Sequence, residues 1–210
     1  VMSAPTYPLT LPSTVGIKKS EWGLQRAVGF SQSPFTGSQQ VYEHSMAIWK
    51  AVISLPPMSR EQSADYQTFF MQLHGRRGTF LMGDPDAKTP RGNATQTNLT
   101  ITSSASIGAY DIAVSGLTNS QSNALVKGDY VQLGTGASAK LHMVIANVNA
   151  SGSGTATIQL EPTLKTAITG STSCIIRNTV GVWRMDLNEL RWNSNESSTY
   201  GFSFSCQEAL

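Results

Sequence analysis

A long stretch of low charge and strand-like pattern, running from Asn93 to Asn178, divides this chain into three parts. The whole chain has 28 charged residues, 15 basic and 13 acidic, and only seven lie in this stretch. Those seven are Asp111, Lys127, Asp129, Lys140, Glu161, Lys165 and Arg177. The two flanks resemble one another in composition. Together they hold the other 21 charges and all four tryptophans, Trp22, Trp49, Trp183 and Trp192.

This division predicts one domain inserted into a loop of another. Residues 179–210 are too short to fold alone, so they must rejoin the sheet that residues 15–82 begin. Insertion is tolerated where the two host ends lie close together at an exposed loop. We therefore expect a discontinuous host domain, residues 1–92 with 179–210, and an inserted domain, residues 93–178.

The insertion has the pattern of a small all-β domain. Six short alternating segments are separated by Gly, Asn, Ser and Thr, with no helical period between them: Leu99–Thr102, Tyr110–Ser115, Asp129–Leu133, Leu141–Val148, Ala156–Leu160 and Ser173–Arg177. Short strands at this spacing are typical of an antiparallel barrel or sandwich. The expected fold class is mainly β, with a sandwich-like antiparallel host domain, one α-helix and a small inserted β-barrel.

The flanks predict the rest of the host domain. Ser59 and Gln62 form a capping box after Pro56-Pro57, so a helix begins there, and an apolar face recurs until Gly75 ends it. The remaining expected elements are a proline-rich extended start over residues 1–12, strands at Glu21–Gln32, Thr79–Met82 and Val182–Leu187, a polar turn at Asn193–Ser198, and an alternating last strand, Tyr200–Cys206.

The strand expected at Gln39–Leu55 is unusually long, and both of its faces are partly apolar. Tyr42, Met46, Ile48 and Val52 lie on one side, and Val41, Trp49, Ala51, Ile53 and Leu55 lie on the other. At ~3.3 Å per residue it spans roughly 50 Å, well beyond the usual ~5–6 residues. Two readings stay open: a bent strand that crosses its own core twice, or a strand of which part meets a neighbouring subunit.

The sequence shows no recognisable catalytic or cofactor site. His44, His74 and His142 have no metal-ligand spacing, and Cys174 and Cys206 lie too far apart to suggest a metal or redox motif. We expect both cysteines to be reduced and buried. Asp84 and Asp86 could hold a cation, but a turn explains them as well. We therefore expect no enzyme activity, no cofactor and no metal.

Composition excludes further classes. The net charge of +2 offers no basic field for nucleic acid. No stretch approaches the ~20 apolar residues of a membrane helix, so we expect no membrane contact. The first dozen residues carry three prolines and no basic start before an apolar run, which is not the pattern of a signal peptide.

The flanks resemble the distal tail proteins and related tail-tip minor tail proteins of long-tailed bacteriophages. The resemblance covers residues 7–92 and 180–210 and is carried by Tyr7–Pro12, Ser33–Gln40, Trp49, Ser54–Met58, the aromatic helix with Tyr66 and Phe69-Phe70, Leu73–Phe80, Gly83–Pro85 and Gln207–Leu210. The insertion matches less clearly and is described only as a small barrel of oligonucleotide/oligosaccharide-binding or galectin-like type.

The resemblance implies a structural protein of the virion. Such proteins form a ring, most often a hexamer, that joins the tail tube to the tip hub and other tip proteins, and lets DNA pass without specific binding. Assembly would take place in the bacterial cytoplasm. The alternative is a carbohydrate- or receptor-binding module, for which the insertion offers only the aromatics Tyr110 and Tyr130.

We expect the contact between subunits to follow the long strand and the segments at its two ends. The residues named for it are Phe35, Gln39, Tyr42, Met46, Trp49, Met58 and Arg60.

Overall fold

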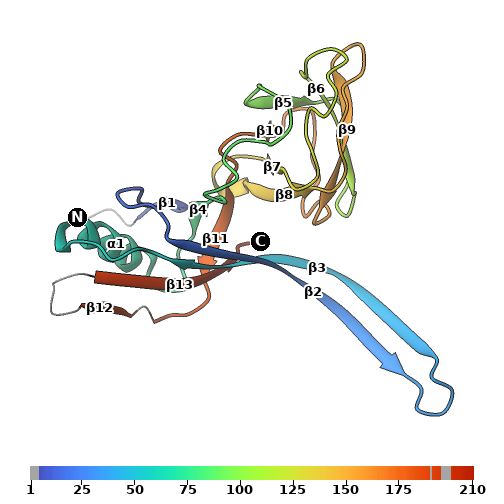
Figure 1. Cartoon of the computed structure of the whole chain (residues 1–210). Coiled ribbons are helices and arrows are strands. Elements are labelled where there is room, and N and C mark those ends of the chain that lie inside the picture. The colour runs from blue at the N-terminus through green and yellow to red at the C-terminus, as the bar shows by residue number, and fades with distance from the viewer. Residues whose placement is uncertain (1–4, 190, 195–199) are drawn as a thin grey trace.

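The computed structural model describes residues 5–189, 191–194 and 200–210. It consists of a mixed sheet with one helix, a closed barrel, and a long two-stranded arm (Figure 1). The expected fold class, mainly β with one α-helix and an inserted small barrel, is confirmed.

Strands from both flanks build one seven-stranded sheet in the order β1-β4-β11-β13-β3-β2, with β12 beside β13. Its strands are β1 (Leu9–Thr10), β2 (Lys19–Gln32), β3 (Gln39–Ser54), β4 (Phe80–Met82), β11 (Gly181–Met185), β12 (Trp192–Ser194) and β13 (Tyr200–Glu208). β11 pairs with β4, and β13 pairs with β3, so the C-terminal flank joins the sheet of the N-terminal flank.

The chain between β4 and β11 forms a closed antiparallel barrel in the order β10-β5-β6-β9-β8-β7. Its strands are β5 (Asn98–Ile101), β6 (Asp111–Ser115), β7 (Tyr130–Leu133), β8 (Lys140–Val144), β9 (Thr155–Glu161) and β10 (Ser173–Ile175), and a short 3₁₀ turn, η1 (Gly136–Ser138), precedes β8. Each of the six predicted segments overlaps one of these strands. The fourth ends at Val144, because Val148 instead bridges Leu125.

The helix α1 (Arg60–Leu73) begins as the sequence predicts. Ser59 is the N-cap, its side chain accepts from the backbone N–H of Gln62, and the Gln62 side chain accepts from the N–H of Ser59. At the other end His74 adopts a left-handed backbone before Gly75. The buried face of the helix carries Ser63, Tyr66, Phe69, Phe70 and Leu73.

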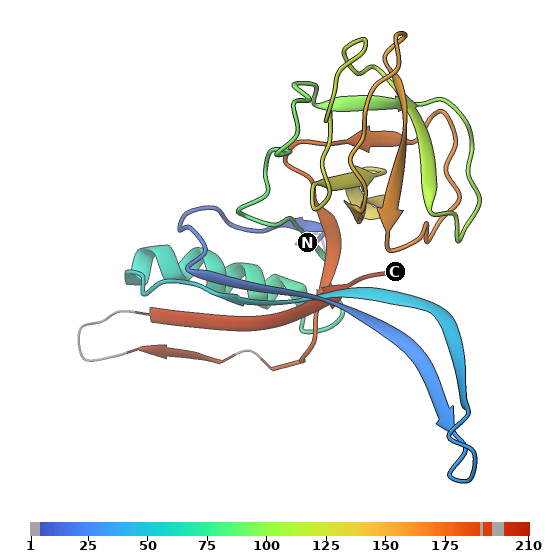
Figure 2. The same cartoon turned by 45° about the vertical axis from the view of Figure 1, so that its right-hand side comes forward.

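One face of the sheet carries the core. Cross-strand pairing places Trp22 opposite Ala51, Ile53 opposite Phe204, and Trp183 opposite Phe80, so these side chains share a face. Helix α1 covers one part of this face, where Phe69 packs on Phe80 and Phe70 packs on Phe204. The outer wall of the barrel covers another part, through Tyr130 and Leu141 (Figure 2). A second cluster fills the barrel itself.

Three sequence expectations need correction. The proline-rich start, which is expected only to be extended, contains a short strand, because Leu9 and Thr10 pair in parallel with β4. The predicted polar turn Asn193–Ser198 contains the end of strand β12, and its residues 195–198 lie outside the described ranges. The long strand β3 does not cross its own core twice, because only its second half lies in the core.

Trp49→Ala is expected to lower the free energy of unfolding by about 3–5 kcal/mol, the usual cost of removing a large buried aromatic. Trp49 is 5% exposed, packs against Tyr130, and donates its indole N–H to the carbonyl oxygen of Leu141 at 2.9 Å. Urea unfolding followed by circular dichroism measures the loss.

The matched control is Trp192→Ala, because Trp192 is 40% exposed. We expect its cost to be less than half that of Trp49→Ala. Equal losses in the two variants would contradict the assignment of Trp49 to the core.

Candidate subunit interface

Strands β2 and β3 continue beyond the sheet as a two-stranded arm, which we define as residues 27–46. Residues from Ala47 to Leu55 lie in the sheet and alternate between buried and more exposed positions. All eight residues from Gln39 to Met46, in contrast, are exposed. The strands stay paired out to Gln32 and Gln39, with a register shift between Arg26 and Val28. Both views show the arm projecting away from the sheet and the barrel (Figures 1 and 2).

Large apolar side chains along this arm are exposed to solvent. Phe30 pairs with Val41, and Val28 lies two residues from Phe30, so these three share one face. Tyr42 lies on the opposite face, and Phe35 lies in the terminal turn. The four strand residues are between 51% and 61% exposed, and Phe35 is 95% exposed.

The arm also lacks charge over most of its length. From Ala27 to Tyr42 the sequence contains no Lys, Arg, Asp or Glu. Exposed strands that must stay unpaired usually carry charges, prolines or bulges against association. A two-stranded hairpin is only marginally stable by itself. An uncharged hairpin with apolar side chains on both faces therefore has the chemistry of a surface that becomes buried in an assembly.

An ion-pair bridge holds the root of the arm. The Arg26 guanidinium pairs with the Glu161 carboxylate of barrel strand β9, and its Nη1 lies 3.5 Å from Oε1 of Glu43 on the neighbouring strand. Glu161 is the less exposed carboxylate of the two. The bridge connects the point where the arm leaves the sheet to the barrel, which restricts the direction of the arm at its root.

The structure divides the residues expected at the subunit contact into two groups. Phe35, Gln39, Tyr42 and Met46 lie on the arm and are exposed, and Arg60 is exposed at the start of α1. Trp49 and Met58 are 5% and 2% exposed and belong to the chain's own core, so they offer no surface to a neighbour. These two residues leave the candidate interface: Trp49 lies after the point where the strand enters the sheet at Ala47, and Met58 lies after the strand and bridges Tyr200.

Sequence reasoning missed the contribution of β2. Val28 and Phe30 are as exposed as Val41, but the prediction considered only the strand with two apolar faces. The uncharged run from Ala27 to Tyr42 was the available signal, because it covers both strands of the hairpin and its turn.

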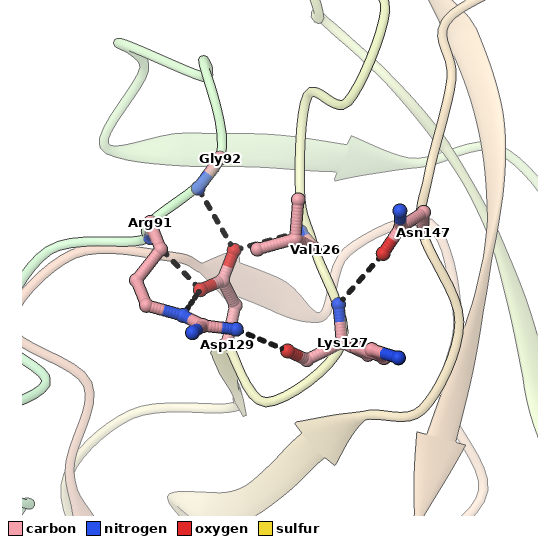
Figure 3. A network of polar contacts seen from close by, with 6 residues as sticks. All are labelled: Arg91, Gly92, Val126, Lys127, Asp129 and Asn147. Atoms are coloured by element: carbon pink, nitrogen blue, oxygen red, sulfur yellow. Dashed lines mark hydrogen bonds and ion pairs between the residues drawn. The ribbon is translucent and has the colours of Figure 1, made fainter.

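A buried carboxylate holds the segment that enters the barrel. Asp129 accepts hydrogen bonds from the backbone N–H groups of Arg91 (2.8 Å), Gly92 (3.2 Å) and Val126 (2.8 Å) (Figure 3). The Arg91 side chain also folds over this turn and donates to the carbonyl oxygen of Lys127 at 2.6 Å. Asp129 thus joins the chain leaving the sheet to the turn before β7, and Gly128 supplies the left-handed backbone of that turn.

Tyr130 is buried between the barrel and the sheet, so its ring offers no exposed surface on which a sugar could stack. Its ring lies 6.4 Å from Trp22 and 6.1 Å from Trp49, measured between ring centroids. Burial and the nearby Asp84 carboxylate raise the pKa of its hydroxyl to about 12. Of the two aromatics considered for carbohydrate binding, only Tyr110 is exposed.

No chemical site assembles from the other candidates. In the described part of the chain, no three His, Cys, Asp or Glu side chains are grouped as metal ligands would be. The Asp84 carboxylate instead accepts from the backbone N–H of Asp86 at 3.1 Å, as expected of a turn. Cys174 and Cys206 are free and buried, as predicted, and burial raises the pKa of both thiols. Within the same ranges, no helix has the length and apolar content needed to cross a bilayer.

Comparison with known proteins adds no family assignment. No family model matches the sequence, and no curated protein matches it.

Asp129→Asn is expected to lower the free energy of unfolding by about 2–4 kcal/mol, because the amide offers one acceptor oxygen where the carboxylate offers two charge-assisted ones. Hydrogen exchange at the amides of Arg91, Gly92 and Val126 should accelerate more than exchange in the helix. Asp111→Asn, at an exposed position in the barrel, is the control. Unchanged exchange at the three amides would contradict the role assigned to Asp129.

The protein is expected to lose stability as the pH falls from about 6.5 to about 4. Burial lowers the pKa of His142 to about 4, and its Nδ1 lies 2.7 Å from the carbonyl oxygen of Pro162. Below its ordinary pKa of ~6.5 the imidazole gains a proton in the unfolded chain but stays neutral in the folded one, which costs up to ~3 kcal/mol.

His142→Gln keeps a donor for Pro162 and should remove most of this pH dependence. Urea unfolding at a series of pH values compares the two proteins. Parallel pH profiles would show that another group is responsible.

Proposed function

We propose that this protein is a structural subunit of a phage tail tip, which assembles through its arm into a closed ring around a channel that DNA crosses. The observation that carries the proposal is the arm, which has no charged residue from Ala27 to Tyr42 and on which Phe30, Val41 and Phe35 are exposed. The resemblance of both flanks to distal tail proteins supplies the biological setting, including the expected hexamer and the tail tube and tip hub as partners.

The position of the arm favours a ring over a simple pair. The arm projects from one end of the molecule, whereas helix α1 and strand β12 lie at the other end (Figure 1). An arm that covers a different surface on its neighbour makes a contact between unlike surfaces. Such a contact repeats from copy to copy until it closes into a ring or continues as a filament. Two arms that cover each other would instead give a dimer.

The charge of the chain suits a channel subunit. A net charge of +2 provides little attraction for the phosphate backbone, so passing DNA would not be retained. The barrel would then project from the ring as a spacer or as a docking surface for other tip proteins. Its single exposed aromatic, Tyr110, gives little support to the alternative of carbohydrate binding.

The double variant Phe30→Ser/Val41→Ser is expected to abolish assembly without unfolding the subunit. Both side chains are exposed and cross-strand partners on the arm, far from the core around Trp49. Analytical ultracentrifugation over a wide concentration range should show an oligomer for the wild type and a monomer for the variant. Negative-stain images of the wild type should show rings.

Ile145→Ser is the matched control, because Ile145 is also an exposed apolar residue (47%) but lies on the barrel after β8, away from the arm and from α1. It should assemble like the wild type. A wild type that stays monomeric at high concentration, or that forms only dimers, contradicts the ring. Rings that form but do not join phage tail tubes would support the proposed assembly and contradict the assignment to a tail tip.

A further inference from the structure

The turn at the tip of the arm is held together by its own hydrogen bonds. The backbone N–H of Ser33 donates to the carbonyl oxygen of Ser38 at 2.9 Å, and the N–H of Gly37 donates to the carbonyl oxygen of Ser33 at 3.0 Å. The Ser33 hydroxyl also accepts from the N–H groups of Phe35 and Thr36. Phe35 itself is 95% exposed. An aromatic side chain on a preorganised turn loses little conformational freedom on binding, which is typical of the anchor residue of an interface.

A groove of about 440 Å³ lies between the C-terminal end of α1 and the segment that follows β11. Phe70 and Met185 line it and are 7% and 5% exposed, so they connect the groove to the core. Met71, Leu187 and Trp192 line it as well, but they are 61%, 63% and 40% exposed. Three large apolar side chains exposed around one hollow are typical of a surface that binds a partner.

Contacts within the subunit fix the two walls of this groove against each other. The side-chain oxygen of Asn188 accepts from the backbone N–H of Arg76 at 3.2 Å, and the Arg184 guanidinium donates to the carbonyl oxygen of Arg76 at 3.0 Å. A Cβ atom on Gly75 would lie only 3.1–3.3 Å from atoms of Asn188, so the glycine permits this close approach. The groove is therefore already formed in the single subunit.

The tip of the arm and the groove match in charge and in size. No charged residue lies between Ala27 and Tyr42, and Glu189, which lines the groove, is paired with Arg191 at 2.7 Å. Docking the tip therefore leaves no charge opposite an apolar surface without a partner. Clefts of ~300–1,000 Å³ hold drug-sized molecules, so the groove has room for the side chains at the apex of the turn.

We propose that the Phe35 turn of one copy docks into the groove between α1 and the segment after β11 of the next copy. The arm of the same molecule projects away from α1 and β12, so a second copy must supply the tip (Figures 1 and 2). The two surfaces are unlike, and each subunit carries both, so the contact repeats from copy to copy and a closed ring buries every tip and every groove. This inference rests on the proposed ring and names the surface that receives the arm.

One variant on each side of the contact tests the proposal. Phe35→Ala at the tip and Leu187→Glu in the groove should each raise the concentration needed for half-assembly by about tenfold or more, the usual effect of losing an interface anchor. Sedimentation velocity measures this concentration. Both side chains are exposed, so the melting temperature of each subunit should stay close to that of the wild type. Ile145→Glu is the control, because it places the same charge on an exposed apolar position of the barrel and should change assembly less than twofold.

Disulfide cross-linking between two differently labelled subunits identifies the surface that the tip meets. Cys174 and Cys206 are buried, so mild oxidation joins only the introduced thiols. A mixture of Phe35→Cys and Leu187→Cys subunits should give mainly the mixed dimer, because the two positions meet only across the contact. A mixture of Phe35→Cys and Ile145→Cys subunits is the control and should give little of it.

The outcomes separate this contact from the ring itself. A wild type that stays monomeric contradicts the proposed function. A wild type that forms rings unaffected by Leu187→Glu, or in which Phe35→Cys joins Ile145→Cys as readily as Leu187→Cys, overturns the docking contact and leaves the ring. Disulfides formed chiefly between two Phe35→Cys tips overturn both, because arms that cover each other give a dimer.

Discussion

The packing of the barrel's outer wall on the tryptophan face of the sheet fixes the arrangement of the rest of the molecule. Trp49 and Trp22 both contact the ring of Tyr130, and the Trp49 indole donates to the backbone of β8 at Leu141. Trp22 in turn meets Trp183 edge to face at 5.1 Å between centroids. Apolar burial thus continues as one cluster from the sheet to the outer wall of the barrel, while a separate cluster fills the barrel interior.

The few charges of the insertion reinforce this junction. Asp129 binds the entering chain, Lys165 pairs with Glu208 of the sheet, and Glu161 pairs with Arg26 at the root of the arm. A charge in a buried or half-buried place contributes only when it is well paired, so each of these groups also specifies one partner and one geometry. Several of the few charges in this stretch therefore hold parts of the chain together, whereas Asp111 and Lys127 are exposed.

In the described residues, the arm is a segment of paired strands whose apolar side chains are not buried by the rest of the subunit. The sheet and Arg26 hold the root of the arm. Between Ala27 and Met46, however, the side chains of the arm belong to no hydrophobic core. The exposed phenylalanine, valine and tyrosine side chains of the arm leave apolar area in contact with water, which is energetically unfavourable. The structure of the isolated subunit thus contains an unsatisfied surface, which is why assembly is the function that fits it best.

The sequence by itself determined the elements and their grouping into host and inserted strands. Period-two alternation is a local property, so the six barrel strands and the last strand could be located, and the Ser59 capping box fixed the start of the helix to the residue. Only the tertiary structure decided where β3 leaves the core, that Trp49 and Met58 are buried within the subunit, and that Lys165 pairs with Glu208. The physical reason is that burial depends on contacts between residues far apart in the chain. The local sequence pattern around a residue does not specify which distant segment will cover its side chain.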